Sequence, residues 1–157
     1  MQIKCFWLLL LAVMPLASAQ SLSVSSASVK QGDRGSILIS LASPSDRRPI
    51  ALQWDLLYPD DELAIRPDDL VTGSAALGAD KALTCAAPPK QKLYRCILVG
   101  GQKPIPDGPV AIINFQVSDR ARVGAPAIQI RNPIALSPKT QRIDLSTVDG
   151  RIAIEAR

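Results

Sequence analysis

Histidine is absent from this sequence, and aromatic residues and cysteines are few. Without histidine, neither a Ser-His-Asp triad nor a Cys-His pair can be assembled, and no G-x-S-x-G motif for a serine nucleophile occurs. Paired carboxylates at residues 60–62 and 68–69 are the remaining catalytic candidates, but adjacent acids are typical of solvated turns and helix caps. We therefore predict that the chain is not an enzyme and has no cofactor.

The absence of histidine also disfavours metal sites. Two thiols alone do not complete a tetrahedral zinc shell, and the acids between Asp60 and Asp69 lack the alternating spacing and central glycine of an EF-hand. The prediction is no metal, with a Ca²⁺ ion near residues 60–69 as the alternative.

The scarcity of aromatic side chains bears on sugar binding. Downstream of the N-terminal segment there are only Trp54, Tyr58, Tyr94 and Phe115. Trp54 and Phe115 lie in apolar segments and are predicted to be core, which leaves too few aromatics for a stacking platform. A carbohydrate-binding β-sandwich module is therefore kept as the alternative function.

Long apolar runs are also missing, apart from one at the N-terminus. There, Lys4 precedes an apolar segment at residues 6–16 and the small residues Ala17-Ser18-Ala19. This order is typical of a secretory signal peptide, and the run is shorter than the roughly 20 residues of a membrane span. We predict a signal peptide at residues 1–19, one domain at residues 20–157 with no membrane span, and export to the periplasm or the exterior.

The net charge of +4 does not indicate a nucleic-acid surface. The basic residues are scattered along the chain, and acidic residues lie between many of them. Such mixing is typical of a solvated, soluble surface. We predict no nucleic-acid partner.

What the sequence does contain is a repeated alternation of polar and apolar residues, typical of strands with one buried face. Gly, Pro, Asn or Asp bounds most of these segments, which are residues 22–29, 36–42, 50–58, 93–99, 110–117, 126–131 and 148–155. Residues 59–65 are the one helical candidate, capped by Asp60 and Asp61, whereas residues 70–81 have no clear pattern. The pattern predicts an antiparallel β-sandwich, because a parallel sheet would need crossover helices.

Two cysteines follow the predicted signal peptide, Cys85 and Cys96, on either side of a Pro/Lys-rich turn. An even pair in an exported chain predicts a disulfide. The bond would join two neighbouring strands across a hairpin.

Taken in order, these segments resemble a cohesin domain, the bacterial β-sandwich module that binds dockerin modules. The resemblance is carried by residues 24–32, residues 50–65 (IALQWDLLYPDDELAI), Asp107-Gly108 followed by residues 112–117 (IINFQV) and Gly124, and residues 149–154 (DGRIAI). It implies a flattened, jelly-roll-like sandwich of about nine strands.

The resemblance also implies a binding face formed by the third, fifth, sixth and eighth strands. By position these are residues 50–58, two strands within residues 81–99, and residues 110–117. Gln53 then stands where dockerin-binding cohesins often have an aspartate, so it can donate or accept a hydrogen bond but brings no charge. The order Tyr58-Pro59-Asp60-Asp61 and the cysteine pair also depart from the family.

We therefore predict an exported, non-catalytic module that docks a partner protein on one sheet face. The partner would be a dockerin-like module or another extracytoplasmic protein, with polysaccharide as the alternative. Alternation nominates six residues for this face: Ala51, Gln53, Asp55, Tyr94, Asn114 and Gln116. A merely solvated outer face remains the competing interpretation of all six.

Overall fold

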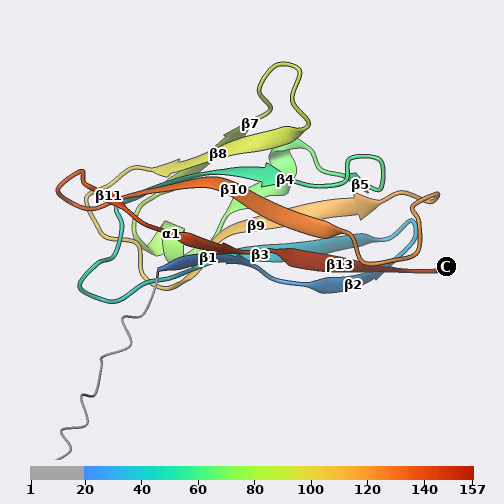
Figure 1. Cartoon of the computed structure of the whole chain (residues 1–157), viewed down its shortest axis with the longest axis horizontal. Helices are drawn as coiled ribbons and strands as arrows, with labels where there is room; N and C mark the ends of the chain where they lie inside the picture. The colour runs from blue at the N-terminus through green and yellow to red at the C-terminus, as the bar shows by residue number, and fades with distance from the viewer. Residues whose placement is uncertain (1–19) are drawn as a thin grey trace, which may run out of the picture.

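Two β-sheets pack face to face around one core in the computed structural model, which describes residues 20–157 (Figure 1). The predicted signal peptide lies outside the described residues. The first sheet contains, in spatial order, β12 (Ser146–Val148), β1 (Ser21–Val24), β3 (Arg34–Ala42), β9 (Gly108–Val117) and β5 (Leu63–Ala64), with β6 (Leu70–Thr72) also paired to β9. The second contains β2 (Ala27–Lys30), β13 (Gly150–Glu155), β10 (Ala127–Leu136), β4 (Ala51–Leu57), β8 (Leu93–Val99) and β7 (Ala82–Ala86), with β11 (Arg142–Ile143) paired to β10.

This architecture confirms the predicted all-β sandwich. Within residues 20–157, nine of the thirteen strands have four residues or more. The predicted antiparallel pairing holds for the neighbours of the long strands β3, β4 and β9. The exceptions are the pairs β1 with β12 and β2 with β13, which are parallel.

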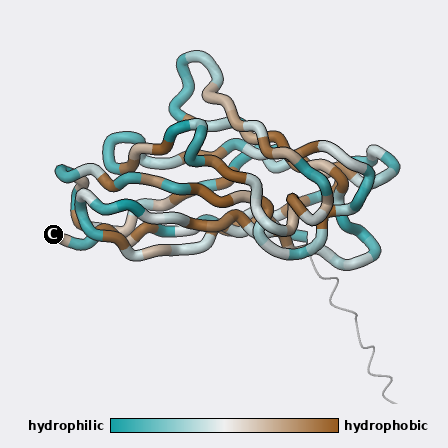
Figure 2. Tube along the Cα trace, turned by 180° about the vertical axis from the view of Figure 1, so that it is seen from behind, coloured by the Kyte–Doolittle hydropathy of each residue, from teal (hydrophilic) through white to brown (hydrophobic). Residues whose placement is uncertain are grey.

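Alternate residues of the long strands form the core. In β3, Ile37, Ile39 and Leu41 are at most 2% exposed, and β4 contributes Leu52, Trp54 and Leu56 in the same way. Removing one such side chain from water contributes about 1.5–3 kcal/mol. Brown apolar stretches accordingly run through the body of the molecule, whereas the loops are mostly teal (Figure 2).

The segment predicted as one strand at residues 22–29 is two strands in different sheets. The chain leaves the first sheet after Val24 and enters the second at Ala27. Gly150 lies against this crossing, where a Cβ atom would be 2.4 Å from the carbonyl oxygen of Ser25. β1 then pairs in parallel with β12, and β2 pairs in parallel with β13.

The helical prediction for residues 59–65 is wrong. These residues form a turn, in which the N–H groups of Glu62 and Leu63 donate to Pro59, followed by β5. The short helices η1 (Pro67–Asp69) and α1 (Ser74–Gly78) lie further along the chain. Within residues 20–157, no helix is both long enough and apolar enough to span a membrane.

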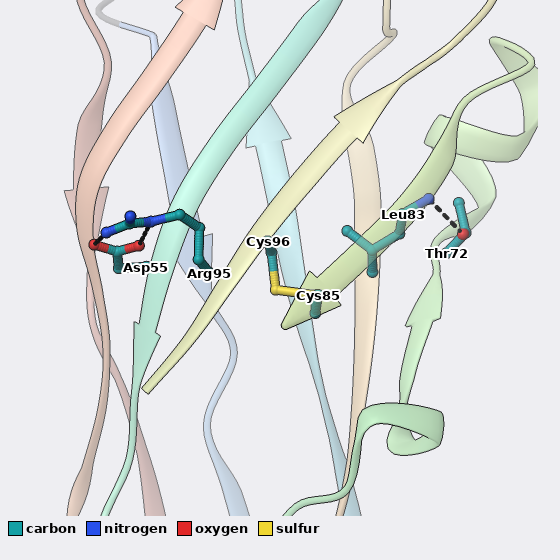
Figure 3. Close-up of a disulfide and its surroundings, with 6 residues drawn as sticks. All are labelled: Asp55, Thr72, Leu83, Cys85, Arg95 and Cys96. Carbon is teal, nitrogen blue, oxygen red and sulfur yellow. Dashed lines mark hydrogen bonds and ion pairs between the residues drawn. A yellow bond between two sulfur atoms is a disulfide. The ribbon is translucent and has the colours of Figure 1, made fainter. Parts of the chain in front are cut away.

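The predicted disulfide is present and joins directly opposed residues of β7 and β8 (Figure 3). β7 is the last strand of the second sheet. On its other side, the N–H of Leu83 donates to the hydroxyl of Thr72 in β6, which links the two sheets at this edge (Figure 3). The loop between β7 and β8 projects from the body of the molecule (Figure 1).

Candidate protein-docking face

The outer surface of the second sheet is organised in rows across the strands. The half-buried Ala51 and Gln53 of β4 lie on this surface, because Leu52 and Trp54 between and beyond them point into the core. In the register of the sheet, Gln53 lies opposite Ile97 of β8 and opposite Ile134 of β10. Opposed residues of neighbouring strands share a face, so these three side chains form one row.

The next row extends the apolar surface. Leu136 of β10 lies opposite Ala51, and Val99 is the next outward residue of β8. Ile97 is 39% exposed and Val99 is 47% exposed. We call the following residues the apolar centre: Ala51, Ile97, Val99, Ile134 and Leu136. Contiguous exposed apolar residues are typical of interaction surfaces, whereas single ones are ordinary.

Asp55 begins the charged row beside the apolar centre, yet it is only 2% exposed. The guanidinium of Arg95 covers it, with Nε 2.7 Å from Oδ1 and Nη2 3.0 Å from Oδ2 (Figure 3). Asn132 donates a further hydrogen bond of 2.9 Å to Oδ2. The hydrogen bonds from Arg95 hold the pKa of Asp55 below its ordinary value, although burial opposes them. The carboxylate is thus ionised and already hydrogen-bonded within the chain.

The second arginine of this row is also paired. Arg131 lies opposite Asp55 in β10, and its Nη1 and Nη2 atoms lie 3.0 and 3.3 Å from the two carboxylate oxygens of Asp149. The same contact holds the pKa of Asp149 below its ordinary value. The outer surface of β10, β4, β8 and β7, which we call the docking face, therefore combines an apolar centre with a row of internally neutralised charges.

Tyr94 does not lie on the docking face, which corrects our expectation. It points into the core at 7% exposure, and its hydroxyl donates a 3.0 Å hydrogen bond to the carbonyl of Ile65. Its ring stacks on Tyr58, with centroids 6.0 Å apart. Burial raises the pKa of Tyr94, which keeps the phenol protonated as a donor.

Asn114 and Gln116 belong to the other sheet. They lie on β9, which pairs with β3, β5 and β6 and not with β4. Our assignment of residues 110–117 to the eighth strand of the binding face is therefore corrected, since the strand beside β4 is β10. Of the six nominated residues, the structure brings together only Ala51, Gln53 and Asp55.

Four residues of the apolar centre were not predicted from the sequence: Ile97, Val99, Ile134 and Leu136. A signal for two of them was present in β8, where both alternating sets are largely apolar: Tyr94, Cys96 and Leu98 are buried, while Ile97 and Val99 are exposed. A strand that is apolar on both faces packs one face into the core and leaves an apolar surface on the other, which a partner can cover. No comparable signal existed in β10, because Pro133 interrupts its pattern at a register shift.

Three of the acids near residues 60–69 interact with other groups of the chain. Asp60 pairs with Lys92 at 3.0 Å, Glu62 pairs with Arg122 at 3.0 Å, and Asp69 accepts a 2.8 Å hydrogen bond from the backbone of Arg66. Across residues 20–157, no three side chains of the metal-binding types are grouped around a common point.

Known proteins resemble this chain in structure rather than in sequence. The sequence matches no protein-family model and no curated protein. A type I cohesin–dockerin complex of Clostridium thermocellum contains a chain with a TM-score of 0.76 at 15% identity, covering 87% of this chain and 99% of that one. The third cohesin of Acetivibrio cellulolyticus ScaC, in complex with a dockerin, has a TM-score of 0.73 at 21% identity and covers 86% and 98%.

A third similar structure is a non-cellulosomal cohesin of the archaeon Archaeoglobus fulgidus. It has a TM-score of 0.73 at 14% identity, covering 88% of this chain and 92% of that one. Residues 20–157 therefore have the cohesin fold.

Proposed function

We propose that this chain is an exported, non-catalytic protein-binding module that docks a partner protein on its docking face. The observation that carries the proposal is the apolar centre, where Ile97 and Val99 are exposed beside charges that are already paired. Several similar structures are cohesins in complex with dockerins. A dockerin-like module is accordingly the proposed class of partner.

The apolar centre and Gln53 would have different roles in binding a partner. Covering the apolar centre would supply the affinity, at about 25 cal/mol for each Å² of apolar surface removed from water. Gln53 lies within the apolar centre and offers an amide, which can both donate and accept. Its hydrogen bonds would fix the register of the partner, since a buried unpaired amide costs about 1–3 kcal/mol.

A substitution pair tests this assignment. Val99→Asp introduces a charge into the apolar centre, whereas Val71→Asp makes the same change on β6 of the other sheet, at a residue of similar exposure (43% against 47%). Proteins of the source organism would be captured from culture supernatant on immobilised wild type, Val99→Asp and Val71→Asp. We expect a protein retained by wild type and Val71→Asp but at least tenfold depleted on Val99→Asp.

Purified dockerin modules would be assayed against the same three proteins by calorimetry. Equal loss of the retained protein from both variants would contradict the assignment of partner binding to the docking face. Retention on insoluble polysaccharide without any retained protein would favour the carbohydrate-binding alternative.

Export has its own test. If residues 1–19 are a signal peptide, the mature protein begins at Gln20. Intact-mass analysis of the protein from its native location would give the mass of residues 20–157, and an uncleaved chain would contradict the proposal.

A further inference from the structure

A polar groove lies on the outer face of the first sheet, on the opposite side of the sandwich from the docking face. It has a volume of about 490 Å³. Two opposed pairs of β3 and β9 form its floor, Arg34 with Gln116 and Ser36 with Asn114. Arg66 and Ala64 line its side.

β5 and β6 pair with two separate stretches of the same edge of β9, and the groove lies in the gap between them. β5 pairs with β9 as far as Gln116, and β6 resumes the pairing only at Ile113. Between them the chain leaves the sheet and forms η1, held by the hydrogen bond from Tyr94 to the carbonyl of Ile65. The small side chains of Ser36 and Ala64 leave the space that the longer residues surround.

The groups facing this space are unusually rich in donors. Arg34 donates from Nε to the side-chain oxygen of Gln116 at 3.0 Å, which orients its guanidinium and leaves the terminal nitrogens to bind elsewhere. Among the ion pairs of residues 20–157, neither Arg34 nor Arg66 takes part. Asp69, the one acid at the groove, accepts the backbone N–H of Arg66 and stabilises the turn of η1.

The groove is also part of a longer surface. Arg34 lines a second hollow of about 410 Å³ beside β2, together with Asp33 and Glu155. Gln116 lines a third of about 520 Å³ beside β5, whose lining includes Asp60, Asp61, Glu62 and Asp119. The hydrogen-bonded Arg34–Gln116 pair is therefore the junction of three adjoining hollows. Arg34 and Arg66, which take part in no ion pair of residues 20–157, line the central groove, whereas carboxylates line the two flanking hollows.

We infer that this groove binds an acidic polysaccharide. Two guanidiniums without a carboxylate partner match a carboxylate in charge and in hydrogen-bonding geometry. Asn114 and Ser36 supply the donors and acceptors that sugar hydroxyls require, whereas the amide of Gln116 is held between Arg34 and the carbonyl of Gly32. The inference does not rest on the proposed docking function.

Affinity electrophoresis would test the groove with polygalacturonate, a polymer of uronic acids, and with neutral hydroxyethylcellulose. We expect the purified protein to be retarded by polygalacturonate and not by hydroxyethylcellulose. Arg66→Gln and Arg34→Gln should each weaken retardation about tenfold, the effect of losing one charge-assisted contact. Arg142→Gln, which removes one charge from exposed β11 of the other sheet, is the matched control and should retain binding.

The possible outcomes separate cleanly. Equal losses in all three variants would show a nonspecific effect of net charge and overturn the inference, as would equal retardation by the neutral polymer. Equally tight binding of a poly-glutamate peptide would show that only carboxylates are recognised, and it would overturn the inference that the ligand is a saccharide. Val99→Asp should leave polygalacturonate binding intact, so that this site and the docking face fail or succeed separately.

Discussion

At the residue scale, Asp55 is the buried charge that links three strands. It lies on β4, and its carboxylate accepts hydrogen bonds from Arg95 of β8 and Asn132 of β10. Asn132 can reach it because the chain there adopts a positive φ of 50° at the register shift of β10. The outward-facing carboxylate therefore stabilises the sheet beneath the docking face.

We predict that Asp55→Asn lowers the free energy of unfolding at pH 7 by about 2 kcal/mol, because charge-assisted hydrogen bonds are lost. The pKa of Asp55 is lowered in the fold, so its stabilisation is complete above the ordinary pKa and is lost as the pH falls through the folded value. Urea unfolding should therefore show the difference from wild type shrinking in acid.

Asp149→Asn is the matched control for that experiment. Asp149 forms the same kind of pair with Arg131, but its side chain is 34% exposed, so the loss should stay below about 1 kcal/mol. Equal losses in the two variants, or a difference that persists in strong acid, would contradict the role of Asp55.

Gly35 is predicted to tolerate no side chain. A Cβ atom there would lie 2.5 Å from Cζ of the buried Phe115 and 2.8 Å from Cγ2 of Val29. Gly35→Ala should destabilise the protein by about 1–3 kcal/mol through overpacking. Gly78→Ala, where no atom lies within 4 Å, should have no destabilising effect in the same thermal unfolding assay. A neutral Gly35→Ala would show that Phe115 can move.

At the scale of elements, the disulfide determines how firmly the edge strand β7 is held. The bond closes a hairpin of sequence separation 11. We predict that the double variant Cys85→Ala/Cys96→Ala loses about 3 kcal/mol of stability on the chain-entropy model. Hydrogen exchange should locate the loosening in β7, with β3 and β9 of the other sheet as the internal control. Unchanged protection of β7 would contradict this.

The strands themselves could be predicted from the sequence, but their neighbours in the sheets could not. Period-two alternation identified β3, β4 and β9 and their buried faces, because burial on one side of a strand leaves that pattern. Alternation carries no information about which strands are neighbours. Asn114 and Gln116 were therefore recognised as outward-facing but assigned to the wrong sheet.

Two further limits concern single elements. Alternation treats every polar residue of a strand as solvated, so it did not anticipate that Arg95 and Asn132 bury Asp55. It was also ambiguous in β8, where Tyr94 and Ile97 are both apolar enough to be core and only the register decides between them. The disulfide was predictable because it needs only two cysteines and one turn.

At the scale of the whole molecule, the docking face and the groove differ in how their charges are paired. The charges of the docking face are paired within the chain, whereas the groove presents two arginines outside any ion pair of residues 20–157. We predict that raising the salt concentration from about 0.05 to 0.5 M changes partner affinity less than about threefold but weakens polygalacturonate binding more than about tenfold. Calorimetry on one preparation would measure both, and equal salt dependence would contradict the assignment.

The parallel pairing of β1 with β12 and of β2 with β13 also has a consequence for the timing of folding. The first strands of the domain obtain these partners only from its last strands, so both sheets remain incomplete until almost the whole domain has been synthesised. The sandwich therefore closes late, because β1 and β2 stay without these neighbours until β12 and β13 are available.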